Sequence, residues 1–326
     1  MFLESYGGLP IRALTTASRA FLVAEGLLAP LPLLHVGRAG RGAAIDGLHE
    51  SVRPLVPDVQ LLDPRDAAAL QPLLRPDAIE LALLEPGAME IDVHGLHQLF
   101  VHQLRARGGV VVTTAAVTSA SHRTGVWTVG DAAGRSWQAP VVVNAAGAWA
   151  DVLAGVFGAA PIGLRALRRT AFMVDAPPGT VAPMIADIDD AFYIKPDAGR
   201  MLCSPADETP QAPGDARPDE LEIARALDVI NEVTTLDARH VRSAWAGLRN
   251  FVPDRTPVVG ADPVAEGFFW FAAQGGYGIQ TAPALARAGA ALVRGEPVPP
   301  DVAERGLTVD AIAPARLRNA RTTPGG

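Results

Sequence analysis

The segment from Gly267 to Leu292 places the strongest constraint on what this chain can fold into. Its sequence is GFFWFAAQGGYGIQTAPALARAGAAL, which predicts an apolar strand over 267–273, a turn with three glycines, and a helix over 279–294. Glycines let the backbone approach a bound group closely, and the unpaired N–H groups at a helix start favour negative charge. A plain strand–helix connection is the alternative, but such turns rarely need three glycines and a tyrosine. The pattern therefore favours a ligand-binding turn.

A second segment, VVVNAAGAWAD, has a similar organisation. A buried strand is expected over 141–144, and the small residues Ala145, Ala146 and Gly147 follow it at a helix start. Small side chains there admit a ligand to the edge of a sheet, although close helix–strand packing would explain them about as well.

Other elements follow from hydrophobic spacing and turn residues. We expect helices over 10–25, 94–107 and 221–231, a strand over VVVTTAAV at 110–117, and a β-meander through residue 140. The last 20 or so residues, rich in Arg, Thr, Pro and Gly, are expected to form a frayed tail.

Length and composition exclude several classes of protein. The 326 residues are enough for about two domains, and the net charge of −7 argues against a nucleic-acid binder. One cysteine, Cys203, excludes a disulfide framework and a multi-cysteine metal site, and no metal-ligand motif is present. No apolar stretch reaches the length of a membrane span, and no signal peptide is recognisable, so a cytoplasmic protein is expected.

Residues 31–63 resemble a nucleotide-binding fingerprint. They predict a strand, a glycine turn at Gly40-Arg41-Gly42, a helix, a second strand and then Asp63. The third glycine of that fingerprint is absent, so a nucleotide-binding module built on this segment is only a minor hypothesis.

Taken together, several segments resemble one family: ESYGGLPIRALTTASRAFL, EIDVHGLHQLF, VVVNAAGAWAD, LRRTAFMV, DAFYIKPDAGRMLCSPADE, WAGLRNFVPDRTPVVG and GFFWFAAQGGYGIQT. They resemble the D-amino-acid oxidase-like family of FAD-dependent oxidoreductases, of the glycine oxidase and sarcosine oxidase type, and within it most closely the D-arginine dehydrogenases. The matching segments lie in order and cover most of the chain.

The resemblance implies a mixed α/β (α+β) fold in which a Rossmann-type FAD-binding domain is interleaved with an antiparallel-sheet substrate domain. It implies an FAD-binding domain formed by 1–27, 88–155 and 242–326. The substrate-binding domain would be formed by 28–87 and 156–241.

The resemblance also implies site residues. Gly275, Gly276, Tyr277, Gly278, Ile279 and Gln280 match the loop that cradles the isoalloxazine ring of FAD, and Ala116 matches a backbone contact to its adenine end. Arg169 and Arg249 match arginines that bind the substrate carboxylate, Tyr6 and Tyr193 match tyrosines of that pocket, and Gly276 also contacts substrate. Tyr6, Tyr193 and Arg249 would then be the catalytic residues.

Arg249 is expected to matter more than Arg169. Trp245 and Phe251 suggest a sheltered setting for Arg249, whereas Arg168 could partly substitute for Arg169.

Two departures from the family pattern carry expectations of their own. The family opens with a βαβ unit carrying G-x-G-x-x-G, which the printed sequence does not contain, so we expect this chain to hold little FAD. Residues 34–40 lack the acidic residue that basic-substrate members place there, so neutral D-amino acids should be turned over at least as well as D-arginine.

The implied activity is oxidation of the CH–NH group of a D-amino acid or related amine. A hydride passes to the flavin, and the imine is hydrolysed to a 2-oxo acid. The partners are then a small amino-acid or amine substrate and an electron acceptor, which is oxygen or another compound. The alternative is a flavin-poor, catalytically silent homologue that at most binds a small carboxylate.

Overall fold

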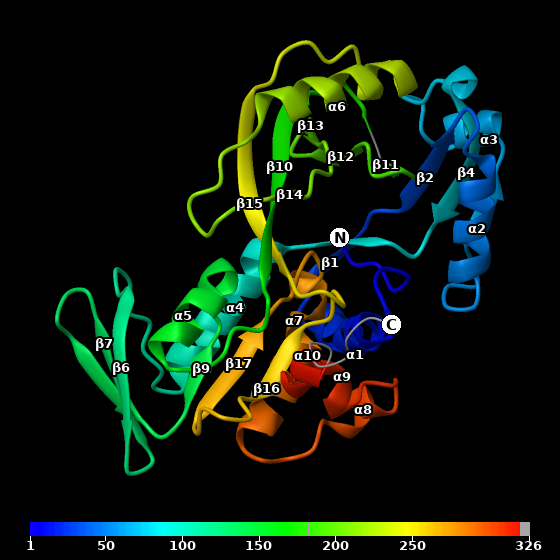
Figure 1. Cartoon of the computed structure of the whole chain (residues 1–326). Coiled ribbons are helices and arrows are strands. Elements are labelled where there is room, and N and C mark those ends of the chain that lie inside the picture. Colours follow the sequence, from blue (N-terminus) through cyan, green and yellow to red (C-terminus); the bar gives the residue numbers. More distant parts are fainter. Residues whose placement is uncertain (181–182, 320–326) are drawn as a thin grey trace, which may run out of the picture. The chain divides into compact units, whose positions relative to one another are not determined.

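The computed structural model of the chain describes residues 1–180 and 183–319. The chain divides into two compact units, each built from separated segments (Figure 1). Unit 1 comprises 1–5, 29–90 and 167–248, and unit 2 comprises 6–28, 91–166 and 249–326. The identification of unit 2 with flavin binding and of unit 1 with substrate binding stays a prediction.

Unit 1 is built on a mixed sheet of nine strands in the order β14-β10-β13-β12-β11-β2-β4-β3, with β15 also paired to β10. These strands are β2 (Leu33–Arg38), β3 (Gln60–Leu62), β4 (Ile79–Glu85), β10 (Arg165–Asp175), β11 (Met184–Asp187), β12 (Tyr193–Asp197), β13 (Arg200–Ser204), β14 (Thr209–Pro210) and β15 (Ser243–Phe251). Most neighbours are antiparallel, whereas β2 and β11 run parallel.

Helices cover this sheet unequally. On one face, Phe172, Ile185 and Ile194 pack with residues of α3 (Pro64–Leu70) and α6 (Glu220–Val233) in the main core of unit 1. On the opposite face, α2 (Gly42–Val52) packs over Leu83 of β4. Residues at alternate positions of β10 and β12 therefore point away from the core that α6 closes.

Unit 2 contains a three-stranded sheet in which β17 (Phe268–Ala272) lies between β16 (Val258–Ala261) and β9 (Val142–Asn144). The pairing with β16 is antiparallel and that with β9 is parallel. The helices α1 (Leu9–Ala24) and α7 (Gly278–Val293) share a core with Val259 and Phe269 of this sheet.

The remaining elements of unit 2 are short or peripheral. They are the meander of β6 (Val117–Arg123), β7 (Val126–Asp131) and β8 (Ser136–Ala139), and the helices α4 (Val93–Ala106), η2 (Gly147–Trp149), α5 (Ala150–Val156), α8 (Pro300–Ala303), α9 (Val309–Ile312) and α10 (Ala315–Asn319). Two further strands, β1 (Leu28–Pro30) and β5 (Met89–Ile91), pair with each other, and a 3-10 turn, η1, spans Pro76–Ala78.

The long helices confirm the sequence-based expectations, because their apolar spacing and end signals are strong. Pro10 lies in the first turn of α1, and Gly108 follows α4 with a φ of 82°. The strand over 267–273 and the helix after it are confirmed as β17 and α7.

Three local expectations were wrong. Residues 110–116 form no strand, because the described chain offers them no partner strand, and Val110 is 79% exposed. Val143 of β9 is 46% exposed rather than buried, because β9 is an edge strand. The C-terminal segment is helical at α9 and α10, since Ile312 and Leu317 are buried in the cores of unit 2; residues 320–326 of the expected tail lie outside the described residues.

The nucleotide-binding interpretation of residues 31–63 was also wrong. β2 and β3 both run antiparallel to β4, which lies between them, whereas the fingerprint requires adjacent parallel strands. The backbone N–H of Gly40 donates to the Glu80 carboxylate at 2.6 Å, so an acid occupies the place of a phosphate. Asp63 caps α3 by accepting from two backbone N–H groups.

Candidate functional site

The turn between β17 and α7 has a backbone that only small residues permit. Ala273 and Gly275 have φ values of 61° and 57°, in the left-handed region. The Gly275 N–H donates to the Asn250 carbonyl at 2.9 Å, which ties the turn to the end of β15. A Cβ at Gly275 would overlap the Phe251 ring, so the close approach of backbone to ring requires glycine there.

Arg249 lies beside this turn. A Cβ on Gly276 would be 3.0 Å from Nη1 of Arg249, so the guanidinium rests against the glycine backbone. The neighbouring Phe251 is buried, as expected, but Trp245 is 45% exposed. The expectation that Trp245 shelters Arg249 was therefore wrong, and Arg249 itself is only partly buried.

Aromatic rings line the same turn. Tyr6 and Tyr277 have ring centroids 4.9 Å apart, and Phe251 meets Tyr277 edge-on at 6.2 Å. Tyr277 is buried, whereas Tyr6 is 41% exposed. Tyr6, which is partly exposed beside Tyr277, can therefore contact a small molecule at the turn against which Arg249 also lies.

The first turn of α7 carries no side-chain cap on its N–H groups. The N-terminal end of the α7 dipole therefore places a partial positive charge at Gly278 and Ile279. The side chain of Gln280 instead points into unit 2 and donates to Thr15 of α1 at 2.8 Å, so only its backbone could contact a ligand.

An apolar cavity of about 520 Å³ lies elsewhere in unit 2. Its lining residues are Ala115, Ala116, Val117, Ala146, Trp149, Val152, Leu153 and Val156. Ala116 was singled out from the sequence, but Trp149 and Val152 of the cavity wall were not. The sequence VVVNAAGAWAD could have indicated Trp149 as a lining residue, because this aromatic residue directly follows the small residues expected to admit a ligand.

In unit 1, Arg169 and Tyr193 stand on the same face of the nine-stranded sheet. Each is offset by an odd number of positions from a core residue, Arg169 from Phe172 and Tyr193 from Ile194. Both therefore lie on the face opposite to α6. Arg169 Nε donates to the Asp207 carbonyl at 2.8 Å, and its Nη2 lies 3.3 Å from Oε1 of Glu208.

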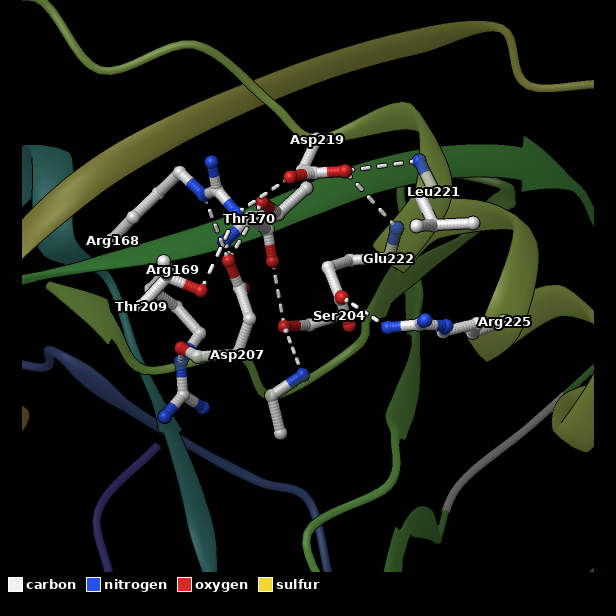
Figure 2. A network of polar contacts seen from close by, with 11 residues as sticks. Arg168, Arg169, Thr170, Ser204, Asp207, Thr209, Asp219, Leu221, Glu222 and Arg225 are labelled. Atoms are coloured by element: carbon white, nitrogen blue, oxygen red, sulfur yellow. Dashed lines mark hydrogen bonds and ion pairs between the residues drawn. The ribbon is translucent and has the colours of Figure 1, made fainter. Parts of the chain in front are cut away.

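Arg168 points to the other face and belongs to a structural network (Figure 2). Its guanidinium pairs with Asp207 at 3.1 Å and with Asp219, the N-cap of α6, at 2.9 Å. Burial alone would lower the pKa of Arg168, but these two carboxylates outweigh it and raise the pKa. The expectation that Arg168 could substitute for Arg169 was therefore wrong.

Cys203 is a buried core residue of β13. Burial raises the pKa of its thiol to about 12, so the thiolate that would be needed for nucleophilic chemistry is not formed near neutral pH.

Most of the chain matches a known protein family. Residues 18–292 match the family model described as "DAO: FAD dependent oxidoreductase". The chain belongs to this FAD-dependent oxidoreductase family. The DAO match covers both units, from α1 through α7.

Two curated proteins are similar to parts of this chain. FAD-dependent oxidoreductase domain-containing protein 1 of Bos taurus is 31% identical over 171 residues, covering 47% of this chain and 35% of that protein. Mitochondrial sarcosine dehydrogenase of Mus musculus is 25% identical over 230 residues, covering 64% of this chain and 24% of that protein. The chain thus spans about a third or less of the length of these relatives.

Solved structures share the DAO fold. L-proline dehydrogenase from P. horikoshii superposes with a TM-score of 0.82 at 17% identity, covering 98% of this chain and 86% of that one. Glycine oxidase from Geobacillus kaustophilus gives 0.79 at 21% identity, covering 92% and 83%. The mixed α/β fold expected from the resemblance is therefore confirmed.

The features of unit 2 fit the cofactor of DAO proteins. The bare glycine backbone and uncapped N–H groups at the start of α7 suit a flat flavin ring whose reduced form carries negative charge. The apolar cavity at Ala116 suits an aromatic base. Within the described residues, no helix combines the length and the apolar character needed to cross a membrane.

Proposed function

We propose that this protein oxidises the CH–NH group of a D-amino acid or a related amine, with FAD as the acceptor of a hydride and a 2-oxo acid as the final product. The observation that carries the proposal is the contact of Arg249 with the glycine turn of Gly276. A guanidinium at that place can hold a carboxylate beside whatever group the turn cradles.

The cofactor would be held by the backbone of Gly275 to Gln280 and by the cavity at Ala116. When bound, FAD supplies the acceptor for the two electrons and the hydrogen that leave the substrate Cα. The positive end of α7 would stabilise negative charge close to Gly278 and Ile279.

The chain's own residues bind and orient the substrate. Arg249 and Arg169 bind its carboxylate, and a forked guanidinium fixes the carboxylate plane as well as its charge. Tyr6 and Tyr193 form walls that restrict the orientation of the Cα–H bond, and Gly276 offers a backbone contact. Holding the reacting carbon in one orientation accounts for much of the rate that such sites contribute. Water then hydrolyses the imine to the 2-oxo acid and releases ammonia, or an amine where the nitrogen is substituted.

A substrate panel tests the proposal. Enantiomeric pairs of neutral amino acids, D-arginine and N-methylglycine are assayed with the FAD-loaded chain and an artificial electron acceptor. We expect kcat/KM for neutral D-amino acids to exceed that of their L-enantiomers at least about tenfold, which needs roughly 1.4 kcal/mol of differential binding. Neutral D-amino acids should also equal or exceed D-arginine. Preference for L-enantiomers would contradict the stereochemistry proposed.

A second candidate is a flavin-poor homologue that binds only a small carboxylate. It is the alternative for a sequence that contains no G-x-G-x-x-G phosphate-binding turn. Incubation with FAD followed by gel filtration distinguishes the two. Stoichiometric flavin absorbance in the protein peak would contradict the second candidate, and a colourless peak that still binds carboxylate would support it.

A further inference from the structure

The ion pair between Arg169 and Glu208 places an acid of the chain itself on a residue proposed to bind substrate. Glu208 Oε1 lies 3.3 Å from Nη2 of Arg169. The side chain of Arg169 is 13% exposed and that of Glu208 is 33% exposed, so the pair is neither sealed in the core nor fully solvated. Glu208 occurs in the segment SPADETP and ends one of the segments that resemble the family.

The two neighbours of Glu208 along the chain have different roles. The side chain of Asp207 is turned to the other face, where it accepts from Arg168 and from the backbone N–H of Thr170 at 2.6 Å. Thr209 lies within β14 and faces Arg168 in the strand register. The Asp207 carbonyl, in contrast, accepts from Arg169 Nε, so the backbone on either side of Glu208 is fixed. Glu208 is thereby held where its carboxylate can reach Arg169.

We propose that Glu208 is a specificity-determining residue, an internal carboxylate that competes with the substrate carboxylate for Arg169 and disfavours substrates with an acidic side chain. The proposal rests on the proposed role of Arg169. When a substrate carboxylate takes Arg169, the displaced Glu208 remains close and repels a second negative charge. A neutral side chain meets no such repulsion.

The competition has a measurable size. A partly exposed ion pair contributes at most about 1 kcal/mol, which corresponds to roughly a fivefold change in a dissociation constant. Without Glu208 a ligand carboxylate no longer has to displace that pair, so its Kd should fall by about this factor. A ligand with a second carboxylate should gain a further factor of about ten beyond this, because it escapes the repulsion as well as the competition.

The experiment measures binding by calorimetry on the full chain, with turnover prevented. The probe is 2-aminoisobutyrate, which has a carboxylate and an amine but no hydrogen on Cα and so cannot be oxidised there. Glu208→Gln should lower its Kd about fivefold. Titrations of the FAD-loaded chain, with its flavin already reduced by dithionite so that no substrate can be oxidised, use the isosteric pair D-glutamine and D-glutamate. The ratio of their Kd values should narrow about tenfold in Glu208→Gln.

A matched control separates local from general charge effects. Glu222→Gln removes one negative charge from a similarly exposed glutamate of unit 1, which pairs with Arg225 on α6. It should leave both measurements unchanged. An equal effect of Glu222→Gln, or an unchanged or raised Kd in Glu208→Gln, would overturn the proposal.

Failure of the proposed function gives a different result. Arg169→Met should raise the Kd of 2-aminoisobutyrate, and in that background Glu208→Gln should have no further effect. If Arg169→Met leaves the Kd unchanged, the role of Arg169 itself fails. If Arg169→Met weakens binding but Glu208→Gln does not improve it, only the inference about Glu208 fails. Arg169→Lys, which keeps the charge, serves where Arg169→Met lowers the melting temperature.

Discussion

The guanidinium of Arg249 lies against the Gly276 backbone at the start of α7, and the proposed chemistry depends on that contact. Loss of one partner of a buried charge pair costs about 2–5 kcal/mol, which is about 30-fold to several-thousand-fold in kcat/KM, and this range applies if bound substrate buries the guanidinium of Arg249. We expect Arg249→Met in the FAD-loaded chain to fall in that range with unchanged flavin content and melting temperature. Arg249→Lys should recover only part of the loss, because an ammonium cannot form the forked pair.

Arg225→Met is the matched control for Arg249→Met, since Arg225 is an exposed arginine on α6. It should leave kcat/KM unchanged. Near-normal kcat/KM in Arg249→Met would mean that Arg249 is structural. Sequence alone ranked Arg249 above Arg169. Of the two aromatic residues expected to shelter Arg249, Phe251 is buried but Trp245 is exposed, and the engagement of Arg168 with Asp207 removes the expectation that Arg168 could replace Arg169.

His35 gives a pH dependence of stability. It lies on β2 between Leu83 of β4 and Ala186 of β11, and burial lowers its pKa from 6.5 to about 4. In the unfolded chain His35 binds a proton below about pH 6.5, whereas in the folded chain it stays neutral down to about pH 4. The neutral, folded His35 therefore contributes fully to the free energy of unfolding above pH 6.5. That contribution is lost as the pH falls from 6.5 to about 4.

The loss at His35 should reach at most about 2 kcal/mol of unfolding free energy between pH 6.5 and pH 5, at about 1.4 kcal/mol per pH unit. Denaturant unfolding at the two pH values measures it. His35→Gln should reduce the pH dependence by that amount, whereas His97→Gln, on the exposed side of α4, should not. An identical pH dependence in wild type and His35→Gln would show that His35 is protonated normally in the folded state.

At the scale of elements, the turn from β17 to α7 is set by steric exclusion. Gly275 has a φ of 57°, and a Cβ there would overlap Phe251. Gly295, after α7, has a φ of 72° with no atom within 4 Å of a Cβ, so it shares the backbone conformation without the overlap. Both Gly→Ala variants should lose about 1 kcal/mol from backbone strain.

Gly275→Ala should lose a further 1–3 kcal/mol or so through overpacking against Phe251, and it should lower FAD retention. Thermal unfolding and flavin absorbance measure the two effects. Equal destabilisation by Gly275→Ala and Gly295→Ala would show that the turn can move away from Phe251.

The network around Asp207 joins β10 to α6. Asp207 accepts from Arg168, and from both the backbone N–H and the hydroxyl of Thr170, so a buried carboxylate is fully used. Asp207→Asn leaves Arg168 short of a partner and should cost about 3 kcal/mol of unfolding free energy. Asp237→Asn, which breaks the exposed pair with Arg239, should cost less than about 0.5 kcal/mol. Equal losses would contradict the structural role of Asp207.

Elements whose signals are local could be predicted from sequence. The helices α1, α4, α6 and α7 carry their own apolar spacing and end residues, and β17 is followed directly by its glycines. The segment 110–112 could not be predicted, because strand formation depends on a partner and not on its run of valines. α9 and α10 were missed because four and five residues are too few to show a helical period, and because Ile312 and Leu317 pack into cores built from residues far away in the sequence.

At the scale of the whole molecule, the residues that the resemblance names as site residues divide between the two units. Tyr6, Arg249 and the turn of Gly275 to Gln280 lie in unit 2, and Arg169 and Tyr193 lie in unit 1. These residues could be named from the sequence only through resemblance. Charge and spacing do not show which arginine is held in a structural ion pair and which can bind a ligand. The pairing of Arg168 with Asp207 and Asp219, and of Arg169 with Glu208, depends on long-range folding of β10.

Anaerobic reduction of the bound flavin tests the central claim most directly. The FAD-loaded chain is mixed with neutral D-amino acids, their L-enantiomers and N-methylglycine in the absence of oxygen, and the visible absorbance of the flavin is followed. The account predicts that D-amino acids bleach this absorbance in wild type, and much more slowly in Arg249→Met. Full bleaching by dithionite but none by any amino acid or amine would contradict it.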